Sequence, residues 1–215
     1  CHHIVDEIED EIERNPGIRA FEAMRVLIAV ERGDEDGCRA AVRDLVERID
    51  DFRFDRNWLT GLWLLAVGCE MVEDEAAAAV LAERLHPYRH LFVDNFSTNF
   101  GSMHQAYGSL RSVLGDHDAA LHELRLALDA HERIGAAGLV ASSQVALARA
   151  EMRRPSPDVA RVRELLASAL ETARLHGLDG VEVQAERCFR SSEDSVGSRG
   201  SLRPSHASRA PRPIV

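Results

Sequence analysis

Residues 101–135 read GSMHQAYGSLRSVLGDHDAALHELRLALDAHERIG, and this stretch is the most informative one about the fold. Two segments with apolar residues at helical spacing, 102–114 and 116–134, stand on either side of Gly115. Glycine commonly ends a helix, and Asp116 is a residue type that often begins the next one. The pattern therefore predicts two antiparallel helices joined by a tight turn.

Small residues mark the place where these two helices are expected to touch. Gly108 in the first helix and Ala120 in the second leave room for two backbones to approach closely. Leu124 and Ala127 follow at helical spacing on the same face as Ala120. With Gly115 at its turn, the segment resembles one tetratricopeptide repeat, whose two helices carry small residues at these positions.

Similar junctions recur along the chain at intervals of about 40 residues, which corresponds to one helical hairpin plus a connection. They are the dipeptides Gly33-Asp34, Glu73-Asp74 and Gly115-Asp116. The small residues that echo the packing positions in the flanking units are Ala66, Ala78, Ala148 and Ala169.

The first unit departs from the pattern, because Val26 occupies the place where a small residue is expected. One hairpin cannot bury its apolar face alone, so such units are stable only when they stack on one another. We therefore predict an all-α fold: a tetratricopeptide-like superhelical stack of antiparallel helical hairpins over residues 1–190, with about four to five hairpins. A plain antiparallel helical bundle is the alternative.

The remaining helices are predicted from apolar residues at helical spacing between glycine, proline and aspartate breaks. Ser156 is expected to cap the helix that ends at Gly177. Residues 191–215 are rich in serine, arginine and proline and lack apolar periodicity, which predicts a disordered tail. The expected helices span 4–14, 18–31, 34–49, 57–72, 74–85, 136–153, 156–177 and 180–189, with loops at 50–56 and 86–101.

The charge composition restricts the chemistry of the chain. Its net charge of −10 argues against a nucleic-acid surface on the folded body, which would need clustered basic residues. All 26 basic residues are arginines. Nucleotide or Schiff-base chemistry that depends on a lysine is therefore excluded within these residues.

The four cysteines are far apart and form no C-x-x-C pair, so a disulfide framework is not expected. No apolar run approaches the ~18 residues of a membrane span, and no signal peptide is visible. These features favour a cytoplasmic protein. The chain begins with Cys1 rather than with methionine, and we expect the natural polypeptide to extend further upstream.

Further segments carry a more specific resemblance: WLTGLWLLAVGC at 58–69, LHPY at 85–88, GS at 101–102, GDHDAA at 115–120, RIGA at 133–136 and LETARLHG at 170–177. In order and spacing they are similar to the helical-repeat region of large bacterial regulators. These are the LuxR-type regulators and class III nucleotide cyclases that carry an AAA-type ATPase module.

The resemblance implies a regulatory segment of a larger signalling protein. In such proteins the repeat region follows the ATPase and restrains the catalytic or DNA-binding output. The present sequence contains no cyclase domain, no Walker motif and no helix-turn-helix after the repeats. The parent activity therefore cannot be assigned to these residues.

The histidines do not predict a metal site. His86 and His90 are four residues apart, but Pro87 interrupts the helix between them. His117 and His122 are five apart, and no carboxylate completes a set with ligand spacing. We therefore expect the histidines to be solvated or to lie in loops.

No other residues predict catalysis or a cofactor. The acidic run at 6–11 lacks the glycine and the alternating oxygen ligands of a calcium-binding loop, so a solvated helix face is expected. Ser142-Ser143 and Ser191-Ser192 lie in no nucleophile-elbow pattern. No catalytic, cofactor-binding or metal-ligating residue is predicted, and the chain is not expected to be an enzyme.

The predicted loop at 86–101 is the best candidate for a binding surface. It carries Tyr88, Phe92, Phe96 and Phe100 in a chain with only 5% aromatic residues. Exposed aromatics are typical of protein and ligand contacts. The alternative is that the phenylalanines fill the gap between stacked hairpins.

These observations favour a non-catalytic interaction or regulatory module whose partner is a protein. The partner is either a neighbouring domain of a larger chain or a separate molecule, and self-association is a further possibility. The alternative is an effector domain that senses a small molecule in the concave groove of the repeats.

Overall fold

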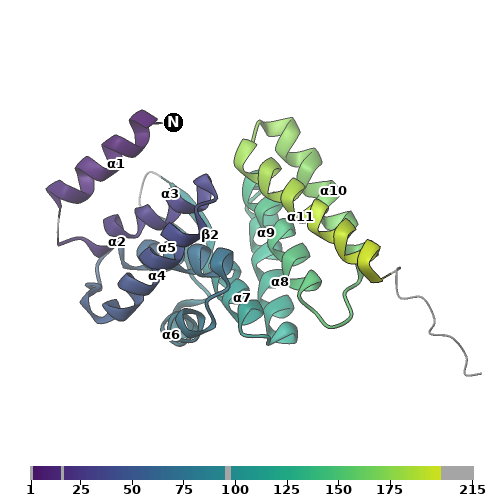
Figure 1. The fold of residues 1–215 in the computed structure, drawn as a ribbon, viewed down its shortest axis with the longest axis horizontal. Helices are drawn as coiled ribbons and strands as arrows, with labels where there is room; N and C mark the ends of the chain where they lie inside the picture. The colour runs from purple at the N-terminus through teal and green to yellow at the C-terminus, as the bar shows by residue number, and fades with distance from the viewer. Residues whose placement is uncertain (1, 16, 95–97, 200–215) are drawn as a thin grey trace, which may run out of the picture.

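A computed structural model describes residues 2–15, 17–94 and 98–199 of the chain. The described part is mostly helical, which confirms the predicted helical class, and helices adjacent in the sequence pack side by side (Figure 1). Within these residues, no helix combines the length and the apolar character that a membrane span requires. The helices are α1 (His2–Arg14), α2 (Arg19–Glu22), α3 (Met24–Arg32), α4 (Glu35–Glu47), α5 (Trp58–Val72), α6 (Glu75–Leu85), α7 (Met103–Val113), α8 (His117–Arg133), α9 (Ala137–Met152), α10 (Val159–His176) and α11 (Asp179–Arg199).

Aspartate side chains begin several of these helices. Asp34, Asp74 and Asp116 each accept a hydrogen bond from the backbone N–H three residues later, which confirms the predicted starts of α4, α6 and α8. The start predicted for α10 is wrong, because Asp158 rather than Ser156 caps that helix. A carboxylate accepts hydrogen bonds from the first turn more strongly than a hydroxyl does.

Gly108 within α7 and Gly115 in the turn between α7 and α8 serve different purposes. A Cβ atom added at Gly108 would lie 2.8 Å from Cγ of Leu124 and 3.2 Å from the carbonyl oxygen of Ala120, so the helices touch there. Gly115 has open space around its α-carbon and a φ of +75°, a conformation that favours glycine. The other residues proposed for repeat packing, all fully buried, are Ala66, Ala78, Ala120, Leu124, Ala127, Ala148 and Ala169.

Val26 departs from the repeat pattern, and Gly68 on α5 accommodates it. Val26 is fully buried. A Cβ atom added at Gly68 would lie 2.1 Å from Cγ1 of Val26, 2.9 Å from Cγ2 of Val42 and 3.1 Å from Sγ of Cys38. The bulk at position 26 is thus matched by the missing side chain on the facing helix.

Two hydrophobic cores divide the described residues. One lies among α3 to α7, which we call the N-terminal half, and the other lies among α8 to α11, the C-terminal half. The close contact of α7 with α8 joins the two. Fully buried leucines mark the centres of the two cores; Leu62, Leu65, Leu81 and Leu110 lie in the first, and Leu124 and Leu166 lie in the second.

A short β-hairpin lies in the stretch that was predicted to be irregular. Strands β1 (Phe92–Asp94) and β2 (Asn99–Ser102) pair antiparallel after a 3₁₀ turn at His86–Tyr88. Val93 is buried beneath the pair and lies opposite Gly101, whose φ is +100°. Strands this short carry little alternating pattern, so periodicity gave no signal for them.

Two helix boundaries also differ from the prediction. The expected helix at 18–31 is divided into α2 and α3. Helix α2 packs closely on α5, where a Cβ atom added at Gly61 would be 3.2 Å from Cα of Ala20. The last helix continues to Arg199, beyond its expected end at Phe189, because no proline interrupts the chain before Pro204. Residues 200–215 of the predicted tail lie outside the described residues.

Candidate functional site

Three of the four aromatics predicted as a binding surface are described, and two of them, Tyr88 and Phe92, line one hollow. Tyr88 is half-buried, and its ring packs edge-on against Trp58 with centroids 4.9 Å apart. Phe92, on β1, is 38% exposed. Phe100, on β2, packs against Trp63 of α5 with ring centroids 5.1 Å apart, and both are partly buried against the first core. Phe96 lies outside the described residues.

Sequence reasoning missed Phe54, the most exposed aromatic residue among those described. Its side chain is 75% exposed in the loop between α4 and α5. The ring lies 5.0 Å from that of Trp58 and 6.0 Å from that of Tyr88, measured between centroids. Its neighbours in the sequence, DDFRFDR at 50–56, are mostly charged. A phenylalanine among charged residues, outside any predicted helix, is unusual, and this was the available signal.

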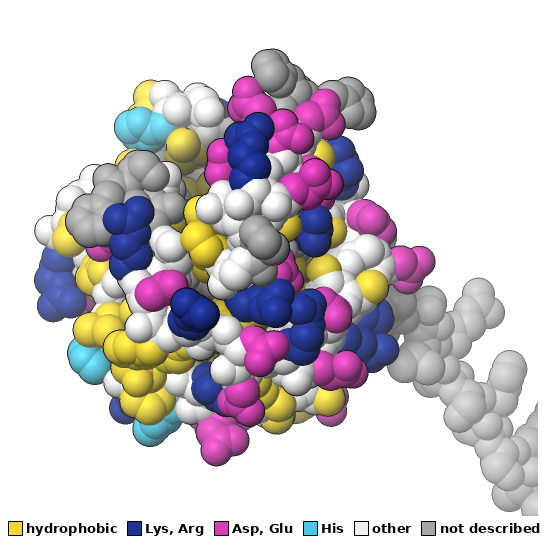
Figure 2. All heavy atoms as spheres, turned by 90° about the vertical axis from the view of Figure 1, so that its left-hand side faces the viewer, with side chains coloured by type: hydrophobic (Ala, Val, Ile, Leu, Met, Phe, Trp, Pro, Cys, Tyr) yellow, Lys and Arg dark blue, Asp and Glu magenta, His cyan; other side chains and the backbone are white. Residues whose placement is uncertain are grey.

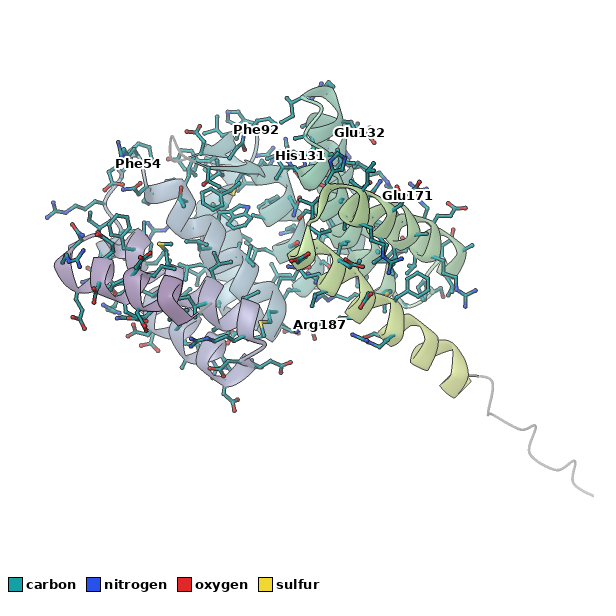
Figure 3. The ribbon with its side chains drawn as sticks, turned by 90° about the horizontal axis from the view of Figure 1, so that it is seen from above. Phe54, Phe92, His131, Glu132, Glu171 and Arg187 are labelled. Carbon is teal, nitrogen blue, oxygen red and sulfur yellow. The ribbon has the colours of Figure 1, made fainter. Side chains whose placement is uncertain are left out.

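Two hollows lie on either side of Phe54, and we call the area that they span the aromatic surface. One hollow, of about 540 Å³, is lined by Val80 and Pro87, and the other, of about 220 Å³, by Phe92. Phe54, Trp58 and Tyr88 line both. Figure 3 shows Phe54 near the α1 end of the molecule and Phe92 farther along the same side.

Three carboxylates and two arginines lie at the edge of the aromatic surface. Glu83 borders the larger hollow, is exposed, and forms no ion pair with any described residue. Asp55 and Asp94 border the smaller one, together with Arg56. Arg84 is already paired with Asp50. The end of the molecule that α1 occupies shows hydrophobic side chains gathered among charged ones in Figure 2.

A buried polar network holds the β-hairpin that carries Phe92. His131, which is 0% exposed, accepts a hydrogen bond at Nε2 from the backbone N–H of Ser102 (2.7 Å). Its Nδ1 lies 2.8 Å from the hydroxyl of Ser143, which donates to Oε1 of Gln105 at 2.8 Å. These bonds tie β2 to α7, α8 and α9.

The prediction that the histidines are solvated is wrong for His131. Burial lowers its pKa to about 4, and the Ser102 N–H occupies the nitrogen that a second proton would need. Its pairing with Ser143 resembles that of a nucleophile and a base, but both side chains are fully buried. Across the described residues, no three His, Cys, Asp or Glu side chains come together as a metal site requires.

A separate hollow, which we call the arginine groove, lies between the N-terminal and C-terminal halves. It has a volume of about 660 Å³ and is lined by residues of α3, α5, α9 and α11. Its arginines are Arg32, Arg149, Arg153 and Arg187. Figure 3 shows Arg187 on the side of the molecule opposite to Phe54 and Phe92.

Ion pairs cross the floor of the arginine groove. Arg153 of α9 contacts Glu70 of α5 at 3.4 Å and Glu73 at 2.8 Å, and Arg149 lies 3.8 Å from Glu70. Burial opposes the charge of Arg153, but these carboxylates raise its pKa above the ordinary value. The pairs therefore link the two halves through two carboxylates, Glu70 and Glu73, and Glu70 is shared by both arginines.

The chain was also compared with known proteins. No protein family, curated protein or solved structure matches it. Any functional assignment must therefore rest on the geometry of the two surfaces described above.

Proposed function

We propose that the chain is a non-catalytic helical-repeat module that binds another protein through the aromatic surface. The observation that carries this proposal is the exposed ring of Phe54 between two hollows. The Phe54 side chain is 75% exposed, so most of its apolar surface faces water, whereas protein interfaces are enriched in aromatic anchors.

The arrangement of helices supports the same proposal. Helices adjacent in the sequence pack side by side, Gly108 provides a close approach between α7 and α8, and the N-terminal and C-terminal halves have separate cores. We infer a tetratricopeptide-like stack from these features together with the repeated junctions in the sequence. We further propose that the module belongs to a larger bacterial signalling protein of the LuxR or cyclase type.

The chemistry of the aromatic surface selects one kind of partner. The two hollows share Phe54, Trp58 and Tyr88 as lining residues, and their walls are largely apolar and aromatic. Glu83 and Asp55 at the edges favour a basic neighbour. The expected ligand is an extended peptide that carries apolar or proline residues next to arginine or lysine.

A displayed library of random peptides tests this proposal. We expect the chain to select peptides that combine apolar or proline residues with a basic one. Phe54→Ser should weaken their binding by at least about tenfold, because a central aromatic anchor is lost. Fluorescence titration of the selected peptides measures the change.

Leu175→Ser is the matched control for that experiment. Leu175 is 77% exposed on α10, away from the hollows, so the variant removes a similar exposed apolar side chain elsewhere. It should bind the selected peptides as well as the unaltered chain does. Equal binding by the Phe54→Ser variant, or failure to enrich any peptide, would contradict the proposal.

The arginine groove supports a second candidate function, sensing of a small molecule. Arg32 and Arg187 are exposed at its edge without an ion pair among the described residues, and so are Glu35 and Asp179. Free charges of both signs around a hollow suit a zwitterion such as an amino acid.

Thermal unfolding in the presence of free amino acids tests this second function. We expect at least one amino acid to raise the Tm of the unaltered chain, because ligands that bind only the folded state stabilise it. Arg187→Gln should abolish the shift, whereas Arg163→Gln, an exposed site on α10, should keep it. A Tm that no amino acid changes would exclude the zwitterion site.

A further inference from the structure

Residues 200–215, GSLRPSHASRAPRPIV, have the composition that the aromatic surface is expected to bind. They contain three arginines, three prolines and no acidic residue. Proline favours the extended polyproline II conformation, which docks against aromatic-lined grooves at little cost in conformational entropy. All the acidic residues lie in residues 1–199, and the net charge of the whole chain is −10.

We propose that the 200–215 segment of one molecule binds the aromatic surface of a second copy of the same chain. This inference rests on the proposed function, because it names the occupant of that surface. In this arrangement the prolines of the segment occupy the apolar hollows beside Phe54, and its arginines pair with the carboxylates at the edges of the hollows.

The geometry favours binding between two copies over binding within one. The segment begins after Arg199, at the free end of α11, and Phe54 lies near the opposite end of the molecule in Figure 3. A chain of this length spans at most about 50–60 Å when fully extended. To reach its own aromatic surface, the segment would have to run back from one end of the body toward the other. A neighbouring copy can present the surface directly.

The charges also support this pairing. In the part of the chain that the structure describes, Glu83 has no ion pair, and the Asp55 side chain accepts one hydrogen bond, from the backbone N–H of Asn57. Each carboxylate therefore has capacity to accept hydrogen bonds from a guanidinium. If each of two copies lends its segment to the other, the exchange closes a symmetric dimer.

Sedimentation of the full-length chain over a range of concentrations tests the proposal. We expect reversible dimerisation that weakens as salt is added, because guanidinium–carboxylate pairs are screened. Phe54→Ser should weaken the dimer at least about tenfold, and so should the double change Arg209→Ser and Arg212→Ser. Leu175→Ser should dimerise as the unaltered chain does.

Mixing the two defective variants gives the decisive result. The Phe54→Ser chain keeps an intact 200–215 segment, and the Arg209→Ser, Arg212→Ser chain keeps an intact aromatic surface. The mixture should associate more strongly than either variant alone, because one of the two contacts can form. A mixture that stays monomeric overturns the proposal, and so does a dimer that both variants retain.

The outcome for this inference can be separated from that for the proposed function. A synthetic peptide of residues 200–215 that fails to bind, while library peptides bind in a Phe54-dependent manner, would refute only the self-association. Failure of both kinds of peptide would refute both. Contact of the segment with the aromatic surface in a species that sediments as a monomer would also overturn the two-copy arrangement.

Discussion

Gly68→Ala is expected to destabilise the chain by about 2 kcal/mol or more, although alanine favours a helix over glycine by about 1 kcal/mol. The new methyl group would lie 2.1 Å from Cγ1 of Val26, which is too close for a contact between carbon atoms. Val26 is a short, stiff side chain in a filled core, so α3 or α4 must move. Urea unfolding of the variant measures the loss.

Gly138→Ala on α9 is the matched control, because it makes the same change where there is room. A Cβ atom there would lie 3.5 Å from Leu178, an ordinary contact. That variant should be as stable as the unaltered chain or more so, by up to about 1 kcal/mol. Adding Val26→Ala to Gly68→Ala should restore part of the lost stability. If the Gly68→Ala chain unfolds at the same urea concentration as the unaltered chain, the prediction is wrong, and α3 and α5 can move apart at little cost in stability.

The second large expected effect is a loss of folding stability in acid, caused by His131. The pKa of His131 is lowered by burial from 6.5 to about 4, so the unfolded chain takes up a proton between these pH values and the folded chain does not. The contribution of His131 to stability is therefore complete above the unfolded pKa and is lost as the pH falls towards 4. Near pH 4.5 the loss should be about 2.5 kcal/mol.

Unfolding free energies at neutral pH and near pH 4.5 test this expectation. A His131→Gln variant should lose less stability on acidification than the unaltered chain, since it lacks the imidazole. His122→Gln, at an exposed position of the same helix, controls for the loss of a histidine as such. Should the His131→Gln chain show the same pH dependence as the unaltered one, the buried network would not exclude a proton.

Much of the fold could be predicted from local signals. Apolar spacing and the capping aspartates Asp34, Asp74 and Asp116 located most helices, because these signals act within a few residues of each other. The match between Val26 and Gly68 could not be predicted in this way. It joins two helices that are distant in the sequence, and only their packing makes the glycine necessary.

The candidate site was harder to predict for a related reason. Tyr88 and Phe92 were recognised because aromatics were sparse, but their partner Phe54 stands in a charged loop without periodicity. His131 lay on the apolar face of its predicted helix, yet it was assigned to solvent with the other histidines. Its acceptor role depends on the Ser102 N–H, which a β-strand supplies from another part of the chain.

The separation into two cores has a consequence for how the chain acquires its structure in the cell. The most extensive contacts join helices that follow one another along the sequence, so loops that must close during folding are short. All the buried residues of the first core come from the chain before α8. The N-terminal half can therefore begin to assemble its core on the ribosome while the C-terminal half is still being translated.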